Sequence, residues 1–237
     1  MIRAVLFDWG GTLSTSNNDD LLGMWRHAAA VLAPDDPEPL AQRLLEAEHQ
    51  WWQERVGDGD GTGSGTTEDI VRSVAAETHL DVAGALAAYH GAWDARVDHD
   101  PACVPVLQGI RARGWRTGLL SNTHWPRDLH EKWLADAGLL DLLDVRVYTS
   151  DLAHMKPHRE AFLAALGDIP PEDAVFVGDR PRDDIAGASA AGLRTVLLTG
   201  RDVPPYDVTP DAAIPSLADL PAILDAWAFM LGRARGS

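Results

Sequence analysis

The sequence predicts an α/β protein with a parallel sheet, into which a separate all-helical segment is inserted. Three observations support this class. Five short runs are continuously apolar, helical patterns separate the later runs, and residues 15–100 contain helical patterns only. Continuous apolar strands that alternate with helices favour a parallel sheet covered by helices on both faces.

The predicted strands are short, as buried strands of this class usually are. They cover residues 4–7 (AVLF), 116–120 (RTGLL), 145–148 (VRVY), 174–177 (AVFV) and 194–198 (RTVLL). Helices are predicted between the later strands, at 126–137, 159–166 and 184–191. The stretch from 201 to 222 holds five prolines, and an amphipathic pattern at 217–231 is expected to form a last helix that packs on the sheet.

The inserted segment falls between the first and second strands. Its periodic stretches predict helices near 20–33, 37–55, 67–78 and 81–95. The chain therefore divides into a core of residues 1–14 and 101–237 and an insertion of residues 15–100. Four tryptophans lie in the insertion, and they either form its small core or place one or two rings in a pocket facing the sheet: Trp25, Trp51, Trp52 and Trp93.

The low-complexity stretch GDGDGTGSG, residues 57–65, partly resembles a calcium-binding loop. Asp58, Asp60 and Asp69 stand at loop positions one, three and twelve. Position eight is a glycine rather than a hydrophobic residue, and the last ligand is not glutamate. A flexible connection between helices is the simpler interpretation, with Thr66 or Thr67 capping the next helix.

Composition and charge narrow the functions that the chain can have. A net charge of −16 argues against binding nucleic acid or an anionic membrane through a general electrostatic field. The single cysteine, Cys103, excludes an internal disulfide and a cysteine-rich metal site. No signal peptide and no apolar run of about 20 residues is apparent, so we expect a cytoplasmic protein.

Polar residues follow four of the predicted strands, where open parallel sheets bind their ligands. Each taken singly has an ordinary explanation as a turn, cap or surface residue, but together they occur in a fixed order on a matching frame. They are Asp8, the pair Ser121 and Asn122, Lys156 in HMKPHREAF, and Asp179 with Asp183 and Asp184 in GDRPRDD.

The order D-x-x-G-T-L, L-S-N, K-P-x-x-x-x-F and V-G-D-x-x-x-D-D resembles the four motifs of the haloacid dehalogenase superfamily of hydrolases. The resemblance implies a Rossmann-like core, and it identifies the insertion as a helical cap. It also implies that Asp8 is a nucleophile that forms an aspartyl-phosphate.

The same resemblance assigns the other residues of the site. Mg²⁺ would be held by Asp8, the carbonyl of Gly10 and Asp179, with Asp183 and Asp184 outside this set and Asp184 orienting metal-bound water. Ser121 and Lys156 would serve the phosphoryl group as hydrogen-bond donor and fixed positive charge. Substrate contacts would come from the backbone N–H groups near Gly11, and from Asn122 and His124.

Gly10 occupies the position where phosphatases of this superfamily carry a second aspartate that acts as acid and base. Its carbonyl can still bind a metal, but it cannot transfer a proton, a loss of roughly 10²–10⁴-fold in rate. His124 could supply the proton, or it could instead help to cap the next helix. Trp9 is expected to pack beneath the loop rather than to contact the substrate.

Other chemistries of the superfamily fit the residues less well. Dehalogenases use no metal and lack the paired acids that Asp179, Asp183 and Asp184 provide. A Schiff base needs a lysine in the insertion, and residues 15–100 contain none. Phosphosugar mutases depend on the missing acid. The sequence therefore predicts an Mg²⁺-dependent phosphohydrolase acting on a small phosphorylated metabolite. The alternatives are a metal-free dehalogenase-like hydrolase and a binding or regulatory protein with little turnover.

Overall fold

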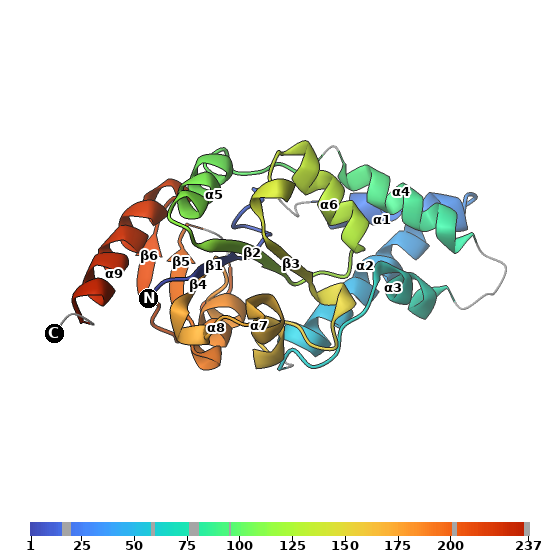
Figure 1. Cartoon of the computed structure of the whole chain (residues 1–237). Coiled ribbons are helices and arrows are strands. Elements are labelled where there is room, and N and C mark those ends of the chain that lie inside the picture. The colour runs from blue at the N-terminus through green and yellow to red at the C-terminus, as the bar shows by residue number, and fades with distance from the viewer. Residues whose placement is uncertain (16–19, 58–59, 76–80, 95, 201–202, 235–237) are drawn as a thin grey trace.

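The computed structural model describes residues 1–15, 20–57, 60–75, 81–94, 96–200 and 203–234. Across these residues the core is a six-stranded parallel sheet with the strand order β3-β2-β1-β4-β5-β6 (Figure 1). The strands are β1 (Ala4–Phe7), β2 (Arg116–Ser121), β3 (Val145–Tyr148), β4 (Ala174–Gly178), β5 (Arg194–Leu198) and β6 (Ala212–Ile214). The five predicted strands and the α/β class are confirmed.

Helices cover both faces of the sheet, as its continuous apolar strands require. Helices α5 (Cys103–Ala112) and α6 (Arg127–Asp136) lie on one face, and α7 (Arg159–Leu166) and α8 (Gly187–Ala191) lie on the other (Figure 1). The side chains of β1 alternate between them. Val5 and Phe7 belong to the apolar cluster of the first face, and Ala4 and Leu6 to that of the second.

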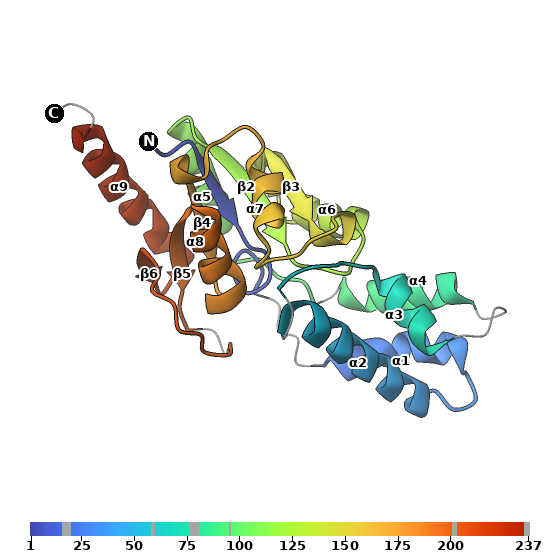
Figure 2. The same cartoon turned by 90° about the horizontal axis from the view of Figure 1, so that it is seen from below.

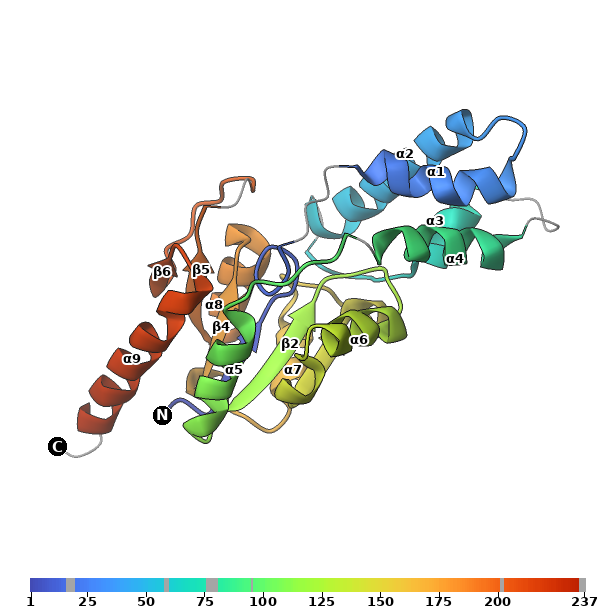
Figure 3. The ribbon, with the colours of Figure 1, turned by 90° about the horizontal axis from the view of Figure 1, so that it is seen from above.

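The described part of the insertion contains four helices at the predicted positions: α1 (Leu21–Leu32), α2 (Glu38–Trp52), α3 (Thr67–Val74) and α4 (Val82–Trp93). Capping explains where three of them begin. Asp20 and Asp81 each accept a backbone N–H bond, and Thr66 forms a capping box with Asp69. The four helices lie beyond the carboxyl ends of the strands (Figures 2 and 3).

Most of the inserted tryptophans pack internally. Trp25 is fully buried and stacks on Tyr89, with ring centroids 4.1 Å apart, and Trp93 is also buried. Trp51 is buried too, whereas Trp52 is half-buried. Trp25 thus belongs to the small core of the insertion, whereas Trp51 and Trp52 lie against His124 and Trp93 lies against Trp125, where the insertion meets the core.

Three elements differ from the sequence prediction. Helix α5 was not predicted from the sequence. It contains Pro105, which stands in its first turn, where proline is tolerated. Strand β6 has only three residues within the proline-rich stretch, and it forms because β5 offers a free edge. The predicted helix at 184–191 begins with a π-helical turn at Pro181–Ala186 before α8.

Helix α9 (Leu220–Ala234) packs on the edge of the core rather than across the sheet (Figure 3). Leu220 and Leu224 are buried, and Asp225 forms an ion pair with Arg113 at 2.7 Å. A search of the described residues found no helix long and apolar enough to cross a membrane.

Candidate active site

The sheet brings the predicted site residues together because their strands are neighbours. Strand β1 lies between β2 and β4, with Phe7 in register with Leu119 and Val177. Asp8 follows β1, Ser121 ends β2, and Asp179 follows β4, so all three stand at one edge of the sheet. All three side chains are buried, which shields them from bulk water.

Lys156 is the centre of the charge network. Its side chain is 1% exposed, and Nζ lies 2.6 Å from Asp8 Oδ1 and 2.7 Å from Asp184 Oδ1. Burial lowers the pKa of Lys156, but the carboxylates of Asp184 and Asp8 outweigh it and raise the pKa above its ordinary value. Lys156 is therefore a permanent buried cation.

Asn122 fixes the backbone of Lys156. Its Nδ2 donates to the carbonyl of Lys156, and its Oδ1 accepts from the N–H of Lys156, both at 2.8 Å. Both ends of the amide are used in this way, so the substrate contact predicted for Asn122 requires one of these bonds to break. The structure thus shows Asn122 positioning Lys156.

Three carboxylates converge beside the lysine. One oxygen each of Asp8, Asp179 and Asp184 lies within 4.8 Å of the others. Burial, opposed by Lys156, raises the pKa of Asp8 to about 6, and burial together with the charges of Asp8 and Asp184 raises the pKa of Asp179 to about 8. Asp179 Oδ1 is buried, and none of the described residues forms a hydrogen bond with it. Clustered carboxylate oxygens whose joint ionisation is opposed by burial and mutual repulsion fit a hard cation such as Mg²⁺.

The two neighbouring acids of the fourth motif have different environments. Asp184 Oδ1 accepts from Lys156 and its Oδ2 accepts from the N–H of Arg180 at 2.9 Å, and Asp184 lies in the carboxylate cluster. Asp183 is outside that cluster, and Arg182 approaches its Oδ1 at 3.7 Å. Burial and the charge of Asp184 raise the pKa of Asp183 to about 6. The sequence grouped these two residues, and the structure separates them.

Gly10 and Gly11, in the loop after β1, differ in whether the structure leaves room for a side chain. Gly11 has φ +81°, and a Cβ there would lie 2.3 Å from Asp179 Oδ2, so no side chain fits. Its N–H donates to the carbonyl of Ser14 at 2.9 Å rather than pointing to a substrate in this structure. Gly10 is exposed, has no positive φ, and has open space where a Cβ would be.

His124 joins the core to the insertion. Its side chain is 2% exposed, with Nε2 3.0 Å from Glu48 Oε1 on α2 and Nδ1 3.0 Å from the hydroxyl of Thr67 on α3. Burial raises the pKa of Glu48, but hydrogen bonds from His124, Trp25 and Trp52 outweigh it, and the net pKa is lowered. Both ring nitrogens of His124 are thus occupied, and the helix after it starts at Pro126 without a side-chain cap. Neither the acid nor the capping role predicted for His124 matches these contacts.

The loop at 60–64 pairs with the segment that leads into Lys156. Met155 donates its N–H to the carbonyl of Gly61 at 2.6 Å, and Gly63 donates to Ala153 at 2.9 Å. Asp60 accepts from the N–H of Thr62, and Asp69 is used in the capping box of α3. The partial calcium motif is thus a strand-like connection in its described part, while Asp58 lies outside the described residues.

This pairing predicts unequal effects for two glycines of the loop. Both Gly61 (φ +82°) and Gly63 (φ +85°) are left-handed, but a Cβ at Gly61 would lie 2.2 Å from the carbonyl of Met155, whereas a Cβ at Gly63 meets nothing within 4 Å. We expect Gly61→Ala to shift the segment before Lys156 and to lower kcat/KM by ~10-fold or more. Gly63→Ala, which has only the backbone strain, should cost about 1 kcal/mol of stability. Equal effects of the two variants on kcat/KM, measured beside their melting temperatures, would show that the pairing does not position the lysine.

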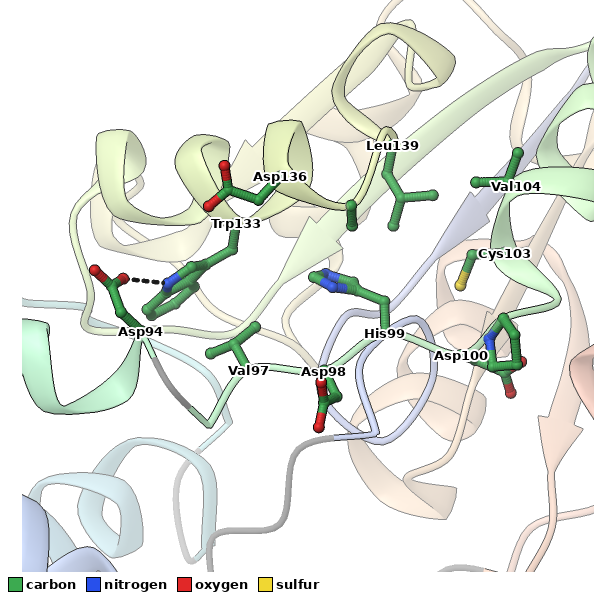
Figure 4. A pocket seen from close by; sticks show the side chains of 12 residues that line it. Asp94, Val97, Asp98, His99, Asp100, Cys103, Val104, Trp133, Asp136 and Leu139 are labelled. Carbon is green, nitrogen blue, oxygen red and sulfur yellow. Dashed lines mark hydrogen bonds between the residues drawn. The ribbon is translucent and has the colours of Figure 1, made fainter.

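A surface pocket of about 380 Å³ lies between the segment that follows α4 and helix α6, and none of the carboxylate cluster residues lines it (Figure 4). Asp94, His99 and Trp133 are among its lining residues. Trp9 packs behind it, stacked on Trp133, and its Nε1 lies 3.4 Å from His99 Nε2. Trp9 is 5% exposed, in agreement with its predicted packing role.

Comparisons with known proteins place the chain in a family. The family model described as haloacid dehalogenase-like hydrolase matches residues 2–192, and the chain belongs to this family. A relative, the glyceraldehyde 3-phosphate phosphatase of Methanopyrus kandleri, is 28% identical over 206 residues, 84% of each chain.

Two solved structures show the same fold. A phosphatase of the family from Thermococcus onnurineus has a TM-score of 0.70 at 23% identity, over 94% of this chain and 98% of its own. A 2-haloacid dehalogenase from Pseudomonas syringae has a TM-score of 0.64 at 24% identity, over 96% of this chain and 100% of its own. Because the fold accommodates both chemistries, the choice between them depends on the site.

Proposed function

We propose that the protein is an Mg²⁺-dependent phosphohydrolase that acts on small phosphorylated metabolites through an aspartyl-phosphate on Asp8. The observation that carries this proposal is the cluster of Asp8, Asp179 and Asp184 beside a single buried lysine. If all three carboxylates are ionised, their charge exceeds that of Lys156, which the raised pKa of Asp179 reflects, and a divalent cation would balance them. The relative from Methanopyrus kandleri, a phosphatase, supports the same class.

The residues of the site suggest how the reaction would proceed. With a pKa of about 6, Asp8 is largely ionised at neutral pH, and its carboxylate oxygen attacks phosphorus while the bond to the leaving oxygen breaks. Lys156 neutralises charge on Asp8 and on the phosphoryl oxygens, and Ser121 donates a hydrogen bond to one of them. Water then attacks phosphorus and releases phosphate and the Asp8 carboxylate. Mg²⁺, bound by Asp8, Asp179 and the Gly10 carbonyl, with Asp184 beside them, would stabilise the charge on phosphate.

The main alternative is dehalogenation, in which Asp8 would form an ester with carbon. Dehalogenation needs only one ionised carboxylate, that of Asp8. Burying the carboxylates of Asp179 and Asp184 beside it costs free energy, and this reaction would not use them. The decisive experiment measures phosphate release from an aryl phosphate with and without Mg²⁺, and halide release from a 2-haloacid. We expect Mg²⁺-dependent phosphate release only. Halide release that survives excess chelator would overturn the proposal, and inactivity in both assays would favour a binding protein.

The glycine at position 10 leads to a prediction about substrates. Without a carboxyl group to protonate the leaving oxygen, the rate should depend steeply on the leaving-group pKa, so aryl and acyl phosphates should react faster than alkyl phosphates. Gly10→Asp should flatten this dependence and accelerate alkyl phosphates by ~10-fold or more. The substitution is feasible because a Cβ at Gly10 meets no atom within 4 Å.

The matched control is Gly10→Asn, which adds the same volume without an acid and should leave the steep dependence in place. Both variants and the natural protein are compared on phosphate monoesters that span a range of leaving-group pKa. A flat dependence in the natural protein would mean that another group already supplies the proton.

The position of the inserted helices supports their interpretation as a cap over the site. They lie beyond the strand ends that carry Asp8 and Asp179 (Figure 2). The core of residues 1–14 and 101–237 would thus supply the reacting groups, and the insertion of residues 15–100 would enclose the substrate.

A further inference from the structure

Arg180 stands next to Asp179 at the rim of the candidate site, and none of the roles above uses it. Its backbone is held firmly, because its N–H donates to Asp184 Oδ2 at 2.9 Å and its carbonyl accepts from the N–H of Asp184 at 3.0 Å. Its side chain is exposed to solvent, unlike the buried side chains of Asp8 and Lys156. Arg180 is thus an exposed cation on a fixed backbone, next in the chain to a member of the carboxylate cluster.

Among the described residues, no hydrogen bond or ion pair involves the guanidinium of Arg180. It remains available for a ligand.

The other cations near the site are already used. Lys156 bonds to Asp8 and Asp184, and Arg182 lies 3.7 Å from Asp183. The insertion contributes five arginines, and each has a partner within the insertion: Arg26 with Glu38, Arg43 with the carbonyl of Val74, Arg55 with the carbonyl of Trp51, Arg72 with Glu68, and Arg96 with Asp20. Among the described residues, Arg180 is therefore a cation beside the carboxylate cluster whose side chain has no assigned partner.

We propose that Arg180 binds a second anionic group of the substrate, so that the preferred substrates are small phosphate esters that also carry a carboxylate or a further phosphoryl group. This inference rests on the proposed phosphohydrolase function. The planar guanidinium suits both anions, because it offers paired N–H donors. The reacting phosphoryl group would lie deeper, against buried Asp8, and the exposed guanidinium would be available to the rest of the substrate.

The test uses neutral aryl phosphates to define how log kcat/KM depends on the leaving-group pKa. In the natural protein, 3-carboxyphenyl and 4-carboxyphenyl phosphate should lie ~10-fold or more above this line. Arg180→Gln should bring them down to the line while changing kcat/KM for phenyl phosphate by less than ~3-fold. Arg180→Lys, which retains the charge but not the paired donors, should keep part of the advantage. Arg182→Gln is the matched control, and it should keep the full advantage.

A parallel measurement with pyrophosphate distinguishes the two anions. If Arg180→Gln lowers kcat/KM for the carboxylated esters alone, the second anionic group is a carboxylate. If it lowers kcat/KM for pyrophosphate as well, Arg180 accepts either anion. An equal loss on phenyl phosphate and on the carboxylated esters would overturn the inference, because Arg180 would then serve the reacting phosphoryl group. Hydrolysis of neutral esters with no advantage for carboxylated ones also overturns it but leaves the phosphatase proposal standing. If no phosphate ester is hydrolysed, both fail.

Discussion

Asp8→Asn is expected to lower turnover of phosphate esters by ~10³-fold or more while the protein stays folded. The amide has nearly the same shape as the carboxylate but is a poor nucleophile. Lys156 keeps one of its two partners in the variant, because Asp184 lies 2.7 Å from its Nζ. Burial already opposes the charge of Asp8, so its removal should not unfold the chain.

Two measurements accompany this variant. Circular dichroism and the melting temperature verify that the fold is retained. Mass spectrometry of the natural protein, quenched in acid during turnover, should find a phosphoryl group on the peptide that contains Asp8 and none on the variant. A variant that kept more than a few per cent of the activity would show that Asp8 is not the nucleophile.

Asp179→Asn is expected to have opposite effects on activity and on stability. It should lower kcat/KM by ~10²-fold or more, because it removes a proposed ligand of Mg²⁺. In metal-free protein at pH 8 it should raise the melting temperature by ~3 °C or more, because it removes a buried carboxylate that has no hydrogen-bond partner on Oδ1.

The pH dependence follows from the raised pKa of Asp179. The carboxyl has a pKa of 3.8 in the unfolded chain and about 8 in the folded, metal-free protein. Between these values the folded state holds a proton that the unfolded state has released, so the free energy of unfolding falls as pH rises through this window. The stabilisation by Asp179→Asn should therefore be absent below about pH 4, grow as pH rises to about 8 and keep its full size above that pH.

Asp183→Asn provides the comparison, since it removes a buried carboxylate of the same loop that lies outside the cluster. The shift of melting temperature with Mg²⁺ concentration measures metal affinity in each protein. We expect Asp183→Asn to weaken Mg²⁺ binding less than Asp179→Asn does. An Asp179→Asn variant that bound Mg²⁺ as tightly as the natural protein would refute the assigned ligand.

The local pattern of the sequence was enough to predict most of the secondary structure. Strands such as AVLF and AVFV are continuously apolar because helices cover both of their sides, and that property is visible in any short window. It could not reveal β6, whose three residues form a strand only because β5 provides hydrogen-bonding partners at its edge. The same limit applies to the loop at 60–64, whose partner segment lies about ninety residues away.

For the candidate site, the sequence determined which groups stand at the carboxyl edge of the sheet, because a residue that follows a parallel strand must lie there. Asp8, Ser121, Lys156 and Asp179 were located in this way. Tertiary structure alone decided how the neighbouring side chains are used. Asn122 holds the backbone of Lys156. His124 bonds to Glu48, 76 residues away. Asp184 joins the carboxylate cluster while Asp183 does not, and Arg180 is left exposed beside them. Hydrogen bonds between distant segments depend on where the folded chain brings their atoms, and no local periodicity encodes that.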